Sequence, residues 1–220
     1  MRVSTGVAGV CAAGFIATAV ELLADGPLKR LDGRIAGHYV DNLANHGYKL
    51  HGFTLRTADL LFLIGKPWIA CVVVGGLGLL ITLRTRRLGP ALAAAVGLGI
   101  AGVGTWFFKE VFPHAAIYQQ RAGSFPSGHT CVAVVSAGLV VAFLVRPRPR
   151  WEATALIAGG AWGAVMAWGR VAMLSHWLSD VIAGWCLGMI ALVVALRLVE
   201  ASMTLDDLSL VRRGLRRSRS

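Results

Sequence analysis

The sequence predicts an all-α integral membrane protein, a six-span transmembrane helical bundle with an interfacial helical segment between spans one and two. Of its 220 residues, 56% are hydrophobic and only 15% are charged, which is far from the average of soluble proteins. Six stretches carry no charge, and each reaches the roughly 20 residues needed to cross a bilayer once flanking residues are added. A water-soluble bundle could not hide so much apolar surface.

The predicted spans lie within a single domain, 1–220, at about 3–23, 66–83, 88–108, 129–146, 152–170 and 177–199. The first span also imitates a secretory signal peptide, because Arg2 precedes an apolar run and Ala17-Thr18-Ala19 resembles a cleavage site. We expect a retained span, since the run is longer than the roughly 7–15 residues of a signal core. Cleavage would not change the sides on which the remaining loops lie.

The longest predicted non-spanning region, 25–65, separates the first two spans. Apolar residues recur in it at helical spacing, with polar residues between them, at Leu31, Ile35, Tyr39 and Leu43. This pattern predicts a helix that lies in the membrane surface and serves as a lid or packing element. Its three histidines have no recognisable metal-ligand spacing.

Arginine clusters set the predicted orientation. They gather between spans two and three at 84–87, between spans four and five at 146–150, and in a basic tail at 210–220. By the positive-inside rule these three places are cytoplasmic. The clusters also explain the net charge of +11 without a nucleic-acid partner.

Small residues inside the spans indicate packing rather than chemistry. Gly159 with Gly163, and Gly184 with Gly188, have the small-x-x-x-small spacing of closely packed membrane helices. The four cysteines form no C-x-x-C pair, and all fall inside predicted spans: Cys11, Cys71, Cys131 and Cys186. We expect them to be small buried apolar residues, with no disulfide framework and no zinc site.

A polar turn at 123–129, Gly-Ser-Phe-Pro-Ser-Gly-His, runs directly into the fourth span. A helix that starts there directs its N-terminal N–H groups and positive dipole end at Ser127 and Gly128, which favours an anion. Gly128 permits close approach of the backbone, and His129 can carry a proton near neutral pH. The turn therefore predicts a phosphate pocket with an acid beside it.

A second polar stretch joins spans five and six. If Ser175 caps the sixth helix, His176 and Asp180 lie four residues apart on one face, where the carboxylate can orient the imidazole as a nucleophile or base. A histidine four residues before an aspartate is most often structural. The functional interpretation gains weight because Lys109, His129 and Arg170 are predicted to end at the same membrane face.

This combination resembles the type 2 phosphatidic acid phosphatase superfamily, a group of metal-independent membrane phosphatases. The family's P-S-G-H motif is matched by 126–129. Its S-R-x5-H-x3-D motif is matched by Arg170, His176 and Asp180, with Gly169 in place of the opening serine. Two motifs in order over a six-span chain make the match specific.

The family's first motif, K-x6-R-P, is irregular here. Lys109 lies at the end of span three, but Ala116 and Ile117 stand where the motif has Arg-Pro. Arg121 is the arginine available in that loop, and we propose it as a displaced substitute, with His114 a second candidate.

The resemblance implies a mechanism in which His176 attacks phosphorus to give a phosphohistidine while Asp180 holds its tautomer. His129 would protonate the leaving group and then activate water. No metal or other cofactor is required, because the phosphate charge would be held by a set of cations and a polar turn: Lys109, Arg121, Arg170, Ser127 and Gly128.

We therefore expect a lipid phosphate phosphatase of the cell membrane, active on the extracytoplasmic side, whose partners are a lipid phosphate substrate and the bilayer. Phosphatidic acid, phosphatidylglycerol phosphate, a polyprenyl diphosphate and lipid A all fit, and the oligomeric state stays open. The alternatives are a lipid phosphoryl transferase and a non-enzymatic membrane protein that binds anionic headgroups. A serine hydrolase using Ser127 is disfavoured because no G-x-S-x-G surrounds it.

Overall fold

The structure is a computed structural model that describes residues 3–46, 57, 60–61, 63–112, 114, 123–145 and 150–217. Seven helices are defined in this part of the chain: α1 (Val3–Leu23), α2 (Pro27–His46), α4 (Pro67–Thr85), α5 (Gly89–Val111), α6 (Gly128–Val145), α7 (Trp151–Ala172) and α8 (Leu178–Arg217). The described residues form no strand. The predicted all-α class is therefore confirmed for them.

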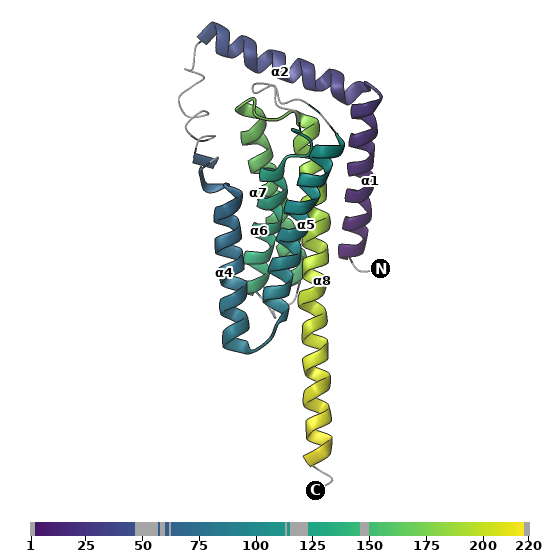
Figure 1. Ribbon diagram of the computed structural model, residues 1–220, viewed down its shortest axis with the longest axis vertical. Coiled ribbons are helices and arrows are strands. Elements are labelled where there is room, and N and C mark those ends of the chain that lie inside the picture. Colours follow the sequence, from purple (N-terminus) through teal and green to yellow (C-terminus); the bar gives the residue numbers. More distant parts are fainter. Residues whose placement is uncertain are drawn as a thin grey trace.

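The helices form an upright bundle with one helix across its end. Figure 1 shows α1 and α4 to α8 along the long axis, whereas α2 lies crosswise over the end opposite the two chain termini. Helix α8 continues well beyond the bundle, so part of the predicted basic tail, up to Arg217, is helical. The crosswise helix covers the end at which α6 and α8 begin.

Within the described part of the chain, five helices are long and apolar enough to cross a membrane: α1, α4, α5, α6 and, in α8, the 25 residues Leu178–Ser202. Helix α7 is long enough, with 22 residues, but its glycines and tryptophans, together with Glu152 and Arg170, lower its hydropathy. Large apolar side chains such as Val103, Leu144 and Ile157 are exposed on the bundle surface, as suits contact with lipid. The chain is a multi-pass membrane protein.

The turn between α4 and α5 shows why these spans end where they do. Arg86 adopts a left-handed conformation with φ 54° just after α4, and Pro90 lies in the first turn of α5, where its missing N–H costs nothing. The Ala91 N–H donates to Thr82 Oγ1 at 3.1 Å. The two helices are thereby joined by a short, closed connection.

The core lies where α6 packs against α7 and α8. A β-carbon added at Gly184 would lie 2.4 Å from the carbonyl oxygen of Ser127, and one added at Gly188 would lie 2.8 Å from that of Cys131. Only glycine permits so close an approach between two backbones. The close packing expected from these two glycines is present, but Cys71 is exposed, so the prediction of four buried cysteines is wrong at that position.

Helix α2 turns a polar residue toward the bundle. Leu31, from the apolar stripe seen in the sequence, is 42% exposed, whereas Asp32 and Ala36 are buried. The side of α2 that contacts the protein is thus displaced by one residue from the stripe that contains Leu31 and Ile35. The side chains of Tyr39 and Leu43 lie outside the described residues.

Candidate active site

The turn before α6 is tied to the start of α8. The backbone N–H of Ser127 donates to the carbonyl oxygen of Asp180 at 2.9 Å, and the Ser127 carbonyl accepts the N–H of Cys131 at 3.1 Å. The Thr130 hydroxyl donates to Ser127 Oγ at 3.1 Å. Helix α6 therefore begins at Gly128, as the turn predicts, and Ser127 is buried as the link between two helix starts.

The turn between α7 and α8 folds back on the last turn of α7. The Ser175 N–H donates to the carbonyl oxygen of Arg170 at 3.1 Å, and Leu174 adopts a left-handed conformation with φ 53°. These features bring His176 back toward Arg170. The expected cap by Ser175 is wrong, because α8 starts at Leu178 and the Ser175 hydroxyl contacts the carbonyl oxygen of Met173 at 3.5 Å.

Asp180 itself caps α8. Its Oδ2 accepts the backbone N–H of Trp177 at 3.2 Å, which is the reciprocal half of a capping box. The same oxygen lies 3.2 Å from Nδ1 of His176. The sequence thus paired the correct two residues, although His176 precedes the helix instead of lying on its face.

The Asp180 carboxylate lies between two imidazoles. Its side chain is 0% exposed, and its second oxygen, Oδ1, is 3.2 Å from Nδ1 of His114. Because an ionised carboxylate only accepts hydrogen bonds, the Nδ1 of each ring carries a proton. When His176 is neutral, its Nε2 therefore carries no proton and has a free lone pair, which is the form that a nucleophile or base needs.

His176 is only 7% exposed, and this burial has the largest effect on its protonation. Desolvation lowers the pKa of His176, while the hydrogen bond to Asp180 and the charge of Asp180 raise it, and the charges of Arg170 and Lys109 lower it further. The net direction is downward. His176 is therefore neutral at pH 7, since an ordinary histidine titrates near about 6.5.

Two cations lie near this pair, Lys109 from α5 and Arg170 from α7. Lys109, Arg170 and His176 all act electrostatically on His129. Lys109 also packs against the polar turn, because a β-carbon at Gly123, which has φ 88°, would lie 3.3 Å from Lys109 Cβ. The structure therefore brings Lys109, His129, Arg170, His176 and Asp180 to one end of the bundle. Arg121 lies outside the described residues.

Two residues at this end were missed as partners of the site. His114 was considered for phosphate, but the structure joins it to Asp180. Asp32 of α2 is 3% exposed, and its Oδ1 accepts the backbone N–H of Ser179 at 3.0 Å. Burial raises the pKa of Asp32. The apolar stripe seen in the sequence runs through Leu31 and Ile35, so no sequence signal pointed to Asp32.

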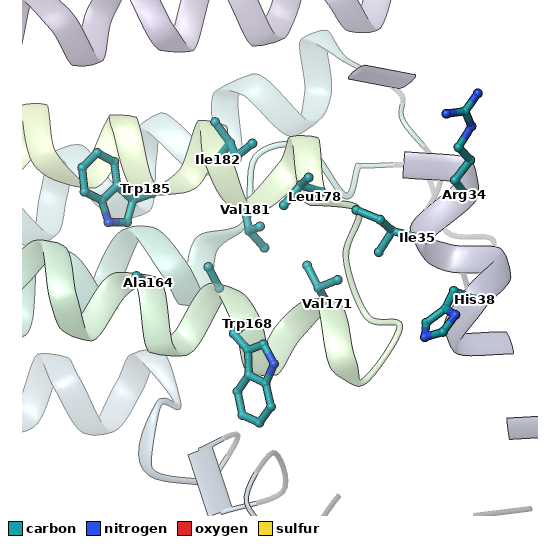
Figure 2. Close-up of a pocket in the computed structure, with 11 residues that line it drawn as sticks. Arg34, Ile35, His38, Ala164, Trp168, Val171, Leu178, Val181, Ile182 and Trp185 are labelled. Atoms are coloured by element: carbon teal, nitrogen blue, oxygen red, sulfur yellow. The ribbon is translucent and has the colours of Figure 1, made fainter. Parts of the chain in front are cut away.

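An apolar groove of about 700 Å³ lies between α7 and α8 near the same end. Figure 2 shows Trp168 and Val171 from α7 and Leu178 and Trp185 from α8 along it, with Arg34 and other residues of α2 at one end. None of the predicted catalytic residues lines it. Val171 and Leu178 stand on either side of the turn that carries His176, so the groove adjoins the site from the apolar side.

Comparisons with known proteins cover this region. Residues 92–204, more than half of the chain, match the family model described as PAP2 superfamily. The chain is 30% identical over 119 residues to an undecaprenyl-diphosphatase of Sulfolobus acidocaldarius, a match that covers 50% of this chain and 54% of that protein. The chain thus spans about half the length of this curated relative.

The fold is also similar to a solved structure. The crystal structure of the first transmembrane PAP2 type phosphatidylglycerolphosphate phosphatase from Bacillus subtilis aligns with a TM-score of 0.64 at 18% identity. The alignment covers 90% of this chain and 96% of that one. It extends the likeness in fold beyond residues 92–204, to nearly the whole bundle.

Proposed function

Because this chain belongs to the PAP2 superfamily, we propose that it hydrolyses the terminal phosphate of a membrane lipid phosphate or diphosphate. The observation that carries the proposal is the contact between His176 Nδ1 and the buried Asp180 carboxylate at 3.2 Å. An oriented imidazole exceeds what anion binding requires, for which cations suffice. Lys109 and Arg170 lie nearby and supply the positive charge that phosphoryl transfer needs, besides a nucleophile, to stabilise the phosphate oxygens.

In the proposed first step, Nε2 of His176 attacks phosphorus and a P–N bond forms as the bond to the leaving oxygen breaks. His129 donates a proton to that oxygen, and Asp180 stabilises the positive charge that develops on His176. In the second step, His129 accepts a proton from water, which attacks phosphorus and releases inorganic phosphate. The P–N bond breaks and His176 returns to its neutral state.

Charge on the phosphate oxygens is balanced by protein cations in this proposal, without a metal ion. Lys109 and Arg170 act on the same imidazole, so both lie near the place where phosphorus is attacked. Arg121 would add a third cation. Gly128, as the first residue of α6, presents the positive end of the helix dipole, while Ser127 holds that end against α8.

The membrane arrangement that we propose has six spans, with α7 as the fifth. Helices α6 and α8 both begin at the site, where Ser127 and Asp180 are hydrogen-bonded, so the chain must cross back between them through α7. Arg84 and Arg86 lie at the far end of α5 from Lys109, which supports a cytoplasmic far end and, in this proposal, a site on the extracytoplasmic face. Helix α2 would then lie in the outer membrane surface.

The substrate is an amphiphile in this proposal. A pocket at headgroup depth admits the phosphate while the tail stays in the bilayer, and the apolar groove beside the His176 turn suits a hydrocarbon chain. The names of the similar proteins point to two compounds to try first, a polyprenyl diphosphate and phosphatidylglycerol phosphate. Phosphatidic acid and a phosphorylated lipid A carry the same terminal group.

The test is phosphate release by the purified protein in detergent from a panel of these four lipids, with and without a chelator. We expect turnover of at least one lipid, unchanged by the chelator. An acceptor lipid is added in a parallel arm, since a phosphoryl transferase would then form a new lipid phosphate in place of free phosphate. Tight binding of the lipids with no turnover in either arm would instead establish the non-enzymatic alternative.

The lowered pKa of His176 predicts the acid side of the pH profile. Neutral His176 is the reactive form, so kcat/KM should rise with pH through an apparent pKa below about 6.5. Asp180 raises the pKa of His176, so Asp180→Asn should move the rising limb to still lower pH besides reducing kcat. A rising limb that moves to higher pH in Asp180→Asn would contradict the assignment to His176. The measurement is kcat/KM at roughly unit intervals between about pH 4 and about pH 8.

A further inference from the structure

The Asp180 carboxylate has two imidazole partners, and the proposed mechanism uses only one of them. Oδ2 contacts His176 Nδ1 and Oδ1 contacts His114 Nδ1, both at 3.2 Å. A carboxylate with both oxygens engaged cannot rotate about its Cβ–Cγ bond without losing a hydrogen bond. The second imidazole therefore fixes the oxygen that orients the first.

His114 is itself held from several sides. Its carbonyl oxygen accepts the backbone N–H of Ser124 at 2.8 Å and the Ser124 hydroxyl at 2.9 Å. Its ring lies 5.8 Å from that of Trp177, measured between ring centroids, with 32° between the planes. The side chain is 18% exposed. These contacts connect the end of α5, the turn before α6 and the start of α8 through one residue.

We propose that His114 is a positioning residue that acts through Asp180 to orient His176, and not the phosphate-binding cation that the irregular first motif lacks. The proposal rests on the hydrolysis proposed above. The Nδ1 of His114 contacts the Asp180 carboxylate, which is 0% exposed, so this atom is not available to a phosphate oxygen. The cost of leaving a buried carboxylate oxygen unpaired explains why a partner is placed there.

Removing His114 should also change the protonation of His176. Groups on three neighbouring elements act on His176, namely Lys109 on α5, Arg170 on α7 and Asp180 on α8, and His176 in turn acts on His129 of α6. Asp180 is the one that raises the pKa of His176. Without His114, the Asp180 carboxylate would have one imidazole partner instead of two, so it would raise the pKa of His176 more strongly. The rising limb of kcat/KM would therefore move to higher pH.

The test compares His114→Asn with His114→Phe. The asparagine amide can donate to Asp180 from about the position of Nδ1, whereas phenylalanine keeps the ring beside Trp177 without a donor. We expect His114→Phe to reduce kcat about 10- to 100-fold, the range for loss of a hydrogen bond to a charged group. KM should stay within about twofold, and the rising limb should move to higher pH. His114→Asn should recover most of kcat.

Several results would overturn the proposal. A normal kcat with a raised KM and weaker inhibition by inorganic phosphate would make His114 a phosphate ligand, and equal rates for the two variants would show that the donor is irrelevant. Unfolding midpoints in detergent report whether His114→Phe is folded, and His114→Ala replaces it otherwise. The wild-type protein is assayed alongside. If it releases no phosphate from any lipid, the proposed function fails, whereas an active wild type with unaltered variants defeats only the role of His114.

Discussion

His176→Ala should abolish lipid phosphate hydrolysis, with a loss in kcat on the order of 10⁴-fold or more. The reaction needs a nucleophile whose lone pair is aimed at phosphorus, and neither other imidazole of the site can serve. His129 is required as the proton donor and acceptor, and His114, although it contacts the same carboxylate, lies outside the motif that contains Arg170, His176 and Asp180. The variant would also leave Asp180 Oδ2 with only the Trp177 N–H as a partner.

A matched control separates chemistry from folding. His176→Asn keeps an amide donor for Asp180 but has no nucleophilic nitrogen, so it should be folded and as inactive as the alanine variant. Substrate labelled at the terminal phosphate should leave acid-labile radioactivity on the wild-type protein after rapid denaturation, and none on either variant. Full activity in His176→Ala would remove His176 from the role that we assign to it.

The sequence predicted the spanning helices closely because each contains a long uncharged stretch. The predicted stretch 88–108 became α5, Gly89–Val111, and 152–170 became α7, Trp151–Ala172. In a bilayer the length and charge of a stretch decide its conformation almost alone. The exception is α8, which extends to Arg217 although the predicted span stops at 199.

The hydrogen-bond partners within the site were predicted less well. The pairing of His176 with Asp180 follows from a spacing of four residues, but the partnership of His114 with Asp180 joins residues 66 apart and depends on the path of a loop. The contact between Asp32 and Ser179 joins residues 147 apart. Propensity and periodicity describe neighbours in the chain, so contacts made by tertiary packing leave almost no trace in one sequence.

Asp32 illustrates how such a contact connects peripheral structure to the site. It lies on α2, the helix that crosses the end of the bundle (Figure 1), and accepts the N–H of the residue next to Asp180. A carboxylate at a helix N-terminus is stabilised by the helix dipole. The crosswise helix is thus fixed to the same first turn of α8 that orients His176, which makes α2 part of the frame of the site and not only a cover.

Gly184→Ala is the second substitution for which we expect a large effect, although Gly184 touches no reacting atom. A β-carbon there would lie 2.4 Å from the carbonyl oxygen of Ser127 and 3.2 Å from its carbonyl carbon and its nitrogen. All three are backbone atoms, which cannot move aside as a flexible side chain does. The turn before α6 would be displaced from α8, and with it the hydrogen bond from the Ser127 N–H to Asp180.

Displacement of this turn moves His129 relative to His176, because His129 follows Ser127 in the first turn of α6 and His176 lies just before α8, close to Asp180. A misplacement of about 1 Å between reacting groups costs on the order of 100-fold in rate. Overpacking of a tight contact costs about 1–3 kcal/mol of stability. We therefore expect a folded protein with a lowered unfolding midpoint and kcat reduced about 100-fold.

Two glycines provide matched controls for Gly184. Gly99 lies inside α5 with nothing within 4 Å of an added β-carbon, so Gly99→Ala should keep wild-type kcat and gain up to about 1 kcal/mol of stability. Gly188→Ala meets the Cys131 carbonyl oxygen at 2.8 Å, one turn further from the site, and should lower stability as much with a smaller loss in kcat. If Gly184→Ala and Gly188→Ala lose stability and kcat in the same proportion, the contact at Ser127 is ordinary packing and the position of His129 must be set elsewhere.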